Sequence, residues 1–216
     1  MGVAGPIPGA GATPGWWPAA RAHLLAADPV LAPVVLAHGQ ACLASRGDPF
    51  ATLARSIVAQ QISLKAAQAI WARVVAAAGR IEPAALMALD APVLRACGLS
   101  GRKVEYLSDL AARFAAGEVD PAGWPALPDE AVIAELVGVR GVGRWTAEMF
   151  LMFNLLRPDV LPLDDVGLLR ALELHYFRGR RPTRDEARAL AERWRPWRTA
   201  ATWYLWRSLE PNPVEY

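Results

Sequence analysis

The sequence predicts an all-α protein, and three observations support this fold class. Apolar residues recur at helical spacing along most of the chain. Residues that favour helix starts, among them Asp48-Pro49, Ser63 and Thr183, precede several of these segments. No segment shows a convincing strand alternation, because Val34-Val35 and Val74-Val75 fall inside helical patterns. We therefore expect helices packed around a core that 216 residues can amply supply.

The N-terminal half predicts a tail followed by a series of helices. Residues 1–14 are rich in Gly and Pro, which predicts a flexible segment. Trp16 and Trp17 start the first helix, where a place in the core is a better interpretation than a base-binding role. Gly98 suits the position just after a helix. The expected helices span about 16–26, 29–38, 49–60, 64–78, 83–89, 92–97 and 102–116. In the helix over 64–78, the pattern predicts burial of Leu64, Ala67, Ile70, Trp71 and Val74.

The C-terminal half begins with the longest loop, Gly117–Pro128, which carries three prolines. Thr183 and Glu186 have the spacing of a capping box. The expected helices span about 129–137, 144–154, 166–176, 184–194 and 198–209, with an extended segment over 158–165. We expect one domain over 15–216, made of a lobe at about 50–160 and a second lobe from about 15–49 plus 161–216, with a cleft between them.

Composition excludes several classes of protein. Hydrophobic residues make up 54% and charged residues 20%, which is typical of a globular chain rather than a disordered one. Cys42 and Cys97 have no paired spacing, so with three histidines they supply neither a disulfide framework nor a zinc or iron–sulfur site. The first twenty residues lack the basic start of a signal peptide. We expect a cytoplasmic protein in a reducing compartment, without membrane contact. The net charge of +2 is compatible with nucleic acid but does not indicate it.

The most informative stretch is a glycine-rich hairpin between two helices. Gly138, Gly141 and Gly143 permit left-handed dihedrals and close backbone approach. A tight hairpin leaves N–H groups exposed at the first turn of the second helix, and these groups together with the helix dipole suit a phosphate. The alternative is an ordinary connection between two helices with no ligand.

Three motifs in order resemble those of one family. Gly141–Ala147, read Gly-Val-Gly-Arg-Trp-Thr-Ala, resembles the helix–hairpin–helix of the DNA-repair glycosylase superfamily. Pro162–Asp165 resembles the segment that carries its catalytic aspartate. Glu192–Arg198, with Trp194 and Trp197, resembles the tryptophan-rich motif of the alkylated-base branch, 3-methyladenine DNA glycosylase II. The resemblance covers about residues 49–210. It implies a monomeric enzyme that flips damaged bases out of double-stranded DNA and hydrolyses their N-glycosidic bonds, which initiates base excision repair.

Asp165 occupies the position of the catalytic aspartate in this resemblance. From the residues alone, Asp164 or Asp165 is more simply an N-cap, since aspartate before a helix is common. Both roles are compatible: Asp164 is expected to cap the helix or orient the substrate while Asp165 faces the cleft. A carboxylate there stabilises the positive charge that builds on deoxyribose as the base departs.

The resemblance also implies further binding residues. Trp145 and Trp206 match positions that line the flipped-base pocket, although with nine tryptophans either could belong to the core instead. Gln61, with Gln60 behind it, matches the wedge that fills the gap left by the flipped base. The expected phosphate contacts come from Gly141, Gly143, Arg144 and Thr146. The backbone carbonyls of Val137, Val139 and Val142 are expected to hold a structural Na⁺ or K⁺, and no other cofactor is expected.

Departures from the family pattern refine this interpretation. Trp145 stands where the bifunctional members have lysine, and the only lysines are Lys65 and Lys103, so a Schiff-base nucleophile is missing and a monofunctional enzyme is expected. Val166 replaces an aromatic pocket residue of the enterobacterial type, and Arg140 replaces a hairpin proline. The sheet domain of that type is not expected here, so a shorter alkylbase glycosylase is the better comparison. Two alternatives stay open: excision of oxidised, deaminated or mismatched bases, and a non-catalytic DNA-binding module.

Overall fold

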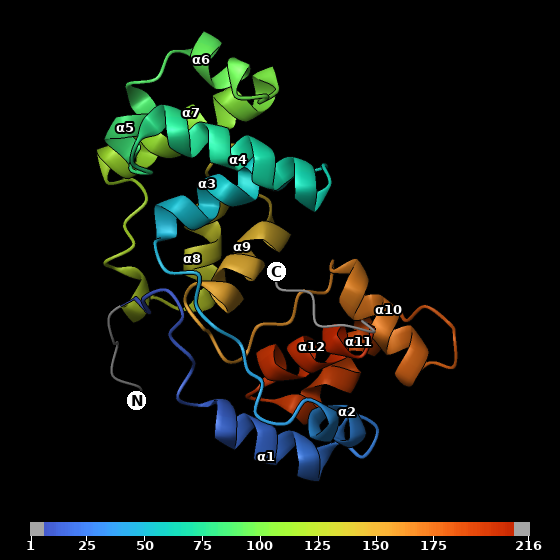
Figure 1. The fold of residues 1–216 in the computed structure, drawn as a ribbon. Helices are drawn as coiled ribbons and strands as arrows, with labels where there is room; N and C mark the ends of the chain where they lie inside the picture. The colour runs from blue at the N-terminus through green and yellow to red at the C-terminus, as the bar shows by residue number, and fades with distance from the viewer. Residues whose placement is uncertain (1–6, 210–216) are drawn as a thin grey trace. The chain divides into compact units, whose positions relative to one another are not determined.

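The structure, a computed structural model, describes residues 7–209, and within that range its regular elements are all helices, which confirms the all-α prediction (Figure 1). The α-helices are α1 (Trp17–Ala27), α2 (Ala32–Ala37), α3 (Pro49–Ala59), α4 (Leu64–Ala78), α5 (Pro83–Met87), α6 (Ala91–Ala96), α7 (Gly101–Ala116), α8 (Asp129–Val137), α9 (Arg144–Phe153), α10 (Val166–His175), α11 (Arg184–Ala191) and α12 (Arg198–Arg207). Two short 3₁₀ helices are η1 (Trp124–Ala126) and η2 (Glu192–Trp194).

The chain divides into two compact units. Unit 1 contains residues up to Ala10 together with Arg46–Phe150, and unit 2 contains Gly11–Ser45 together with the residues from Leu151 onward. The border after residue 150 falls inside α9, ten residues before the expected border of the lobes. The last turn of α9 belongs to unit 2 because Phe153 stacks there on the ring of Trp206, with centroids 5.8 Å apart.

The segment expected as a flexible tail over 1–14 is described from residue 7, and its backbone is paired at Gly11 and Ala12. Gly11 donates its N–H to the carbonyl of Ser45, and Ser45 donates its N–H to the carbonyl of Ala12, both at 2.8 Å. Paired backbone groups of this kind fix the segment against the chain that leads into α3. Residues 1–6 lie outside the described residues.

Unit 1 packs α3, α4, α5 and α7 together, with α8 and the first turns of α9 completing it (Figure 1). Local capping starts these helices as the sequence predicts: Asp48 accepts from the Ala51 N–H at 2.7 Å, and Ser63 caps α4. Of the five residues predicted to be buried in α4, Ala67 and Val74 are buried, Ile70 and Trp71 are half-buried, and Leu64 is 57% exposed. It is the first residue of α4 and lies ahead of the turns that bury Ala67.

Unit 2 is built around α12, whose residues from Thr199 to Trp206 are all buried. A helix that is buried on every side occupies the interior of its unit, and α1, α2 and α10 pack against this one. Trp17 lies in this core, in edge contact with Trp203 at 5.3 Å, so the double tryptophan is part of the core as predicted.

A fully buried carboxylate joins the two sequence segments that form unit 2. Asp28 accepts the Tyr176 hydroxyl at 2.8 Å and the Trp194 indole N–H at 2.7 Å, and its other oxygen accepts the N–H of Leu31. Burial and the hydrogen bond to Asp28 raise the pKa of Tyr176. A carboxylate satisfied in this way is tolerated in a core because each acceptor oxygen has donors.

Within residues 7–209, no helix combines the length and the apolar character that crossing a membrane requires.

Candidate functional site

The glycine-rich hairpin between α8 and α9 depends on one of its three glycines for a left-handed turn. Gly141 has φ +82°, whereas Gly138 continues the right-handed helix with φ −63°. A Cβ at Gly141 would lie 2.3 Å from a ring carbon of Tyr106, which packs directly against the hairpin backbone. Helix α9 then begins at Arg144, and the Gly143 carbonyl accepts the Ala147 N–H at 3.0 Å.

Helix α7 packs against the hairpin and the end of α3 through side chains at a spacing of three residues. This stripe consists of Lys103, Tyr106 and Asp109. The sequence predicted only the apolar face of this helix and did not single out these three residues. Asp109 accepts the backbone N–H of Arg140 at 2.9 Å. Burial opposes its ionisation, but the hydrogen bonds from Arg140 and Arg113 prevail and lower the pKa of Asp109.

Arg144, an expected phosphate contact, is held by two carboxylates in the structure. Its two terminal nitrogens donate to the two oxygens of Glu130 on α8, and its Nε donates to Glu148 at 3.0 Å. These contacts raise the pKa of Arg144 and lower that of Glu130, with the hydrogen bond between them as the largest cause in each case. A bidentate carboxylate presents the same oxygen geometry to guanidinium that a phosphate does.

The resemblance implies that Arg144 contacts a DNA phosphate. On that expectation Glu130→Gln should raise affinity for undamaged duplex about two- to fivefold, because the phosphate would no longer compete with a charged partner for Arg144. The measurement is the dissociation constant as a function of salt, whose logarithmic slope should steepen by up to about one. The control is Glu118→Gln, which removes an exposed carboxylate paired with Arg113 in the same unit. Equal gains in both variants would show that net charge alone explains the effect.

The expected wedge lies at the end of α3 in a backbone conformation that is unusual for its residue type. Gln61 has φ +58° and is exposed. A left-handed non-glycine residue is strained, and such strain clusters at ligand-binding sites. Gln60 donates its side-chain amide to the Gly141 carbonyl at 2.8 Å.

Asp165 lies in unit 2 at the start of α10, and it is the residue that caps this helix. Its Oδ1 accepts the Leu168 N–H at 2.6 Å and the Trp206 indole N–H at 2.7 Å. Of the two aspartates that the sequence left open as the N-cap, Asp165 takes this role and Asp164 does not. Asp164 instead forms an ion pair with Arg184 at the first residue of α11. Two N–H donors and the positive end of the helix dipole stabilise a negative charge on Asp165.

Trp206 is fixed beside that carboxylate. It is 7% exposed, and its ring lies nearly parallel to Phe153, with an interplanar angle of 10°. The backbone of Gly167 approaches the pair so closely that a Cβ there would lie 3.0 Å from Trp206 and 3.1 Å from Asp165 Oδ1. The sequence prediction missed Gly167, although a glycine in the first turn of a predicted helix signals close approach.

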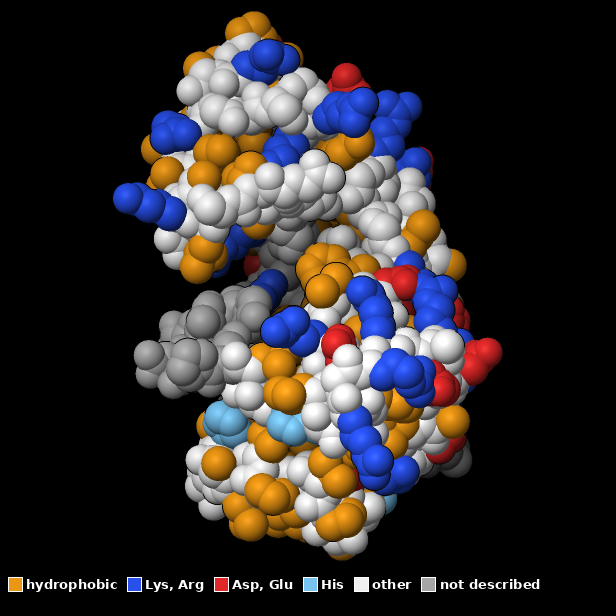
Figure 2. Space-filling model, turned by 90° about the vertical axis from the view of Figure 1, so that its right-hand side faces the viewer, with side chains coloured by type: hydrophobic (Ala, Val, Ile, Leu, Met, Phe, Trp, Pro, Cys, Tyr) orange, Lys and Arg blue, Asp and Glu red, His pale blue; other side chains and the backbone are white. Residues whose placement is uncertain are grey.

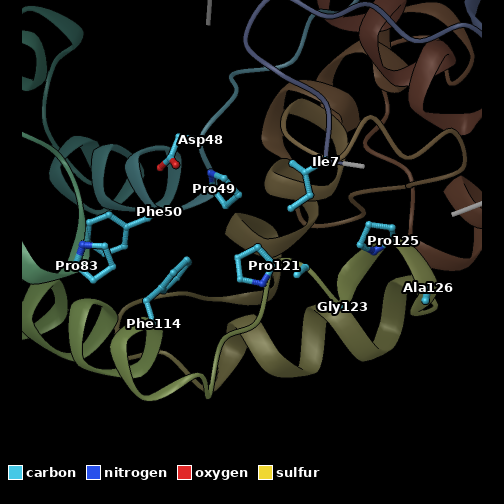
Figure 3. A pocket seen from close by; sticks show the side chains of 11 residues that line it. Ile7, Asp48, Pro49, Phe50, Pro83, Phe114, Pro121, Gly123, Pro125 and Ala126 are labelled. Carbon is cyan, nitrogen blue, oxygen red and sulfur yellow. The ribbon is translucent and has the colours of Figure 1, made fainter. Parts of the chain in front are cut away.

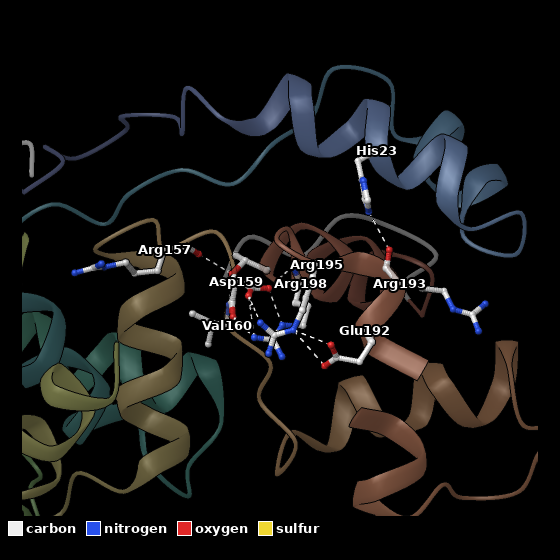
Figure 4. Close-up of polar contacts among 9 residues, drawn as sticks. His23, Arg157, Asp159, Val160, Glu192, Arg193, Arg195 and Arg198 are labelled. Carbon is white, nitrogen blue, oxygen red and sulfur yellow. Dashed lines mark hydrogen bonds and ion pairs between the residues drawn. The ribbon is translucent and has the colours of Figure 1, made fainter. Parts of the chain in front are cut away.

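The extended segment that leads to Asp165 is clamped by the start of α12. Asp159 accepts from Arg198 Nε at 2.6 Å and from Arg195 Nη1 at 3.2 Å (Figure 4). Thr199 adds a hydrogen bond from its hydroxyl to the Arg157 carbonyl. Two arginines of the tryptophan-rich motif, Arg195 and Arg198, therefore hold this segment, whereas Trp194 is buried in the core of unit 2 and Trp197 packs against it.

The remaining expected residues lie around the hairpin in unit 1. Trp145 is 45% exposed on the first turn of α9, and Thr146 is half-buried beside it. The Val139 carbonyl accepts the Val142 N–H at 3.1 Å. Val137 is exposed at the end of α8.

One cavity of unit 1 lies apart from the expected site residues. A cavity of about 730 Å³ in unit 1 is lined by Phe50, Phe114 and several prolines, and it includes none of the expected site residues (Figure 3). On the face drawn in Figure 2, Lys and Arg side chains are scattered rather than gathered in one patch.

Comparison with known proteins decides the family. Residues 54–196 match the model of the HhH-GPD superfamily of base excision DNA repair proteins. The chain belongs to this superfamily. The resemblance read from the hairpin, aspartate and tryptophan motifs is thereby confirmed.

Individual members point to the alkylated-base branch. DNA-3-methyladenine glycosylase 1 of Schizosaccharomyces pombe is 34% identical over 166 residues, which cover 74% of this chain and 72% of that protein. A putative DNA-3-methyladenine glycosylase of Bacillus subtilis is also 34% identical, and the aligned part is 57% of its length, so the chain spans less than two thirds of that relative.

Two solved structures in this superfamily are similar in fold as well. A DNA-3-methyladenine glycosidase of Bacillus halodurans is 34% identical with a TM-score of 0.83, and 89% of each chain is covered. The Schizosaccharomyces pombe 3-methyladenine glycosylase, solved with abasic DNA, is 31% identical with a TM-score of 0.77; the match covers 91% of this chain and all of that one.

Proposed function

We propose that this protein is a monofunctional DNA glycosylase that removes alkylated purines of the 3-methyladenine and 7-methylguanine type from duplex DNA. The observation that carries the proposal is the Asp165 carboxylate, fixed at the start of α10 by the N–H groups of Leu168 and Trp206. The named relatives support the substrate class. A protein with this activity is expected to be located in the cellular compartment that contains the DNA.

The chemistry requires only a fixed negative charge and a water molecule. As the N-glycosidic bond breaks, positive charge develops on the deoxyribose, and Asp165 stabilises it while helping to place the attacking water. At about 4 Å and an effective dielectric of about 20, the attraction is roughly 4 kcal/mol, or about a thousandfold in rate. A rate enhancement of this size is most useful for a base that is already a cation, because such a leaving group needs little protonation.

The substrate class also accords with the aromatic residues. Trp145, exposed on α9, offers an indole face for a flipped cationic base, a contact worth roughly 1–2 kcal/mol. Trp206 contributes mainly by fixing Asp165, since one face of its ring is covered by Phe153. No lysine stands at the position of Trp145, so the product is an abasic site rather than a cleaved strand.

DNA contact is assigned to the hairpin in unit 1. The amides of Gly141 and Gly143, with Arg144 and Thr146, bind a phosphate of the lesion strand, and Gln61 fills the gap left by the flipped base. The backbone carbonyls of Val137, Val139 and Val142 are suited to a monovalent cation. Val139 already accepts one N–H, which leaves its carbonyl oxygen a second lone pair for such an ion. The protein works as a monomer.

The test is mass analysis of the bases released from duplex DNA that contains methylated, oxidised and deaminated bases, with borohydride trapping as the control for lyase activity. Release of 3-methyladenine or 7-methylguanine without a trapped protein–DNA adduct is expected. Release of only oxidised or deaminated bases would favour the other glycosylase class. Binding to duplex without release of any base would favour a non-catalytic module.

Trp206 variants should separate its two contributions. Trp206→Phe keeps an aromatic ring over Phe153 but removes the N–H donated to Asp165, so excision of 7-methylguanine and hypoxanthine should fall alike, by about ten- to a hundredfold. Trp206→Ala should reduce excision of the cationic base further than that of hypoxanthine. Single-turnover rates on both duplexes measure this. A wild-type rate in the Trp206→Phe variant would show that the Trp206 N–H does not position Asp165.

A further inference from the structure

Two carbonyls at the end of α3 are tied to α7 by one lysine. Lys103 Nζ donates to the carbonyls of Val58 and Gln60, both at 2.8 Å. Carbonyls at a helix C-terminus lack partners within the helix, and a lysine ammonium can satisfy them. Because Gln60 is the last residue before Gln61, the ammonium fixes the backbone at the point where the chain turns left-handed.

The same junction is tied to the hairpin. The Gln60 side chain donates to the Gly141 carbonyl at 2.8 Å, so one residue accepts from Lys103 through its backbone and binds the hairpin through its amide. The next turns of α7 reach the hairpin as well, through the Tyr106 ring against Gly141 and the Asp109 carboxylate on the Arg140 N–H. One face of α7 therefore holds both the end of α3 and the hairpin.

We propose that Lys103 is a positioning residue for base flipping: by binding the end of α3 it holds Gln61 in its left-handed conformation and keeps it in register with the phosphate-binding hairpin. The inference rests on the proposed function, in which Gln61 is the wedge. Without the Lys103 ammonium, the backbone next to Gln61 loses two hydrogen bonds. Gln61, which has a strained φ of +58°, is then expected to relax to a right-handed or extended conformation.

The chain contains a matched control, because Lys65 is its only other lysine and is exposed on α4 of the same unit. Lys103→Met and Lys65→Met remove the same charge. The first is expected to lower single-turnover excision of 7-methylguanine by about tenfold or more, since small misplacements of positioning groups have effects of this size. The second is expected to leave the rate within about twofold of wild type.

A fluorescence measurement distinguishes positioning from general support of the fold. The duplex contains a tetrahydrofuran abasic-site analogue with 2-aminopurine opposite it, whose emission changes when a wedge alters its stacking. At saturating protein, wild type and Lys65→Met should produce this change and Lys103→Met should not. Binding to undamaged duplex should remain within about twofold for all three proteins, and Lys103→Arg should restore part of the signal, because a guanidinium can also donate to both carbonyls.

Gln60→Leu is a second variant that leaves Lys103 intact and removes the bond to Gly141. It should lose excision and fluorescence in the same way as Lys103→Met. A Lys103→Met protein with wild-type excision and fluorescence would overturn the inference. So would one in which binding to undamaged duplex falls as far as excision does, because that result indicates only a structural role. If wild type itself releases no base, the proposed function fails instead.

Discussion

Asp165→Asn is expected to lower the rate of alkylpurine excision by about a thousandfold while leaving affinity for abasic-site DNA within a few fold of wild type. The change removes a charge worth roughly 4 kcal/mol in the transition state. It leaves an amide oxygen of the same size, which can still accept from Leu168 and Trp206 and so preserve the cap of α10. Single-turnover excision and equilibrium binding measure the two quantities separately.

The control for Asp165→Asn is Asp185→Asn, which removes a well-exposed carboxylate from the first turn of α11 in the same unit. It should leave both quantities unchanged. Full activity of Asp165→Asn would remove the mechanism. Loss of abasic-site binding together with a lowered melting temperature would show that Asp165 mainly stabilises the fold.

Gly141→Ala is expected to have the second-largest effect, on the hairpin and on all duplex binding. An alanine with φ near +82° is strained by about 1–2 kcal/mol, and its Cβ would overlap the ring of Tyr106 at 2.3 Å, which adds about 1–3 kcal/mol. The hairpin backbone must shift, so its amides no longer converge on a phosphate. Thermal unfolding and undamaged-duplex binding should both decline.

Gly117→Ala separates the two causes. Gly117 ends α7 with φ +72°, and a Cβ there would meet nothing within 4 Å, so this variant carries only the dihedral strain. It should lower stability by about 1–2 kcal/mol without affecting DNA binding. The double variant Gly141→Ala, Tyr106→Ala should recover part of the loss. If Gly141→Ala is no worse than Gly117→Ala, Tyr106 does not constrain the hairpin.

Local signals predicted the helices and the hairpin well. Asp48, Ser63 and the Thr183–Glu186 capping box start the helices as expected, because each contact spans three residues and depends on little else. The hairpin could be located from its glycines, and the motifs identified the family. Leu64 was placed wrongly because helical periodicity does not indicate how far the packed face extends.

The contacts that organise the site join residues far apart in the sequence, and spacing cannot predict them. Trp206 donates to Asp165 across 41 residues, and Lys103 binds Gln60 across 43. Periodicity assigned α7 an apolar face but gave no reason to expect a polar stripe beside it. The two units divide within α9, after Phe150, whereas the sequence suggested a border of the lobes at about residue 160, in the extended segment.

The most direct test of the central claim compares two abasic-site analogues in the same duplex: a neutral tetrahydrofuran and a pyrrolidine whose ring nitrogen is protonated. In the proposed mechanism Asp165 stabilises the positive charge that develops on the sugar, so wild type should bind the cationic analogue more tightly, by up to about a thousandfold. Asp165→Asn should lose this preference while still binding the neutral analogue. Equal binding of the two analogues by wild type would contradict the account.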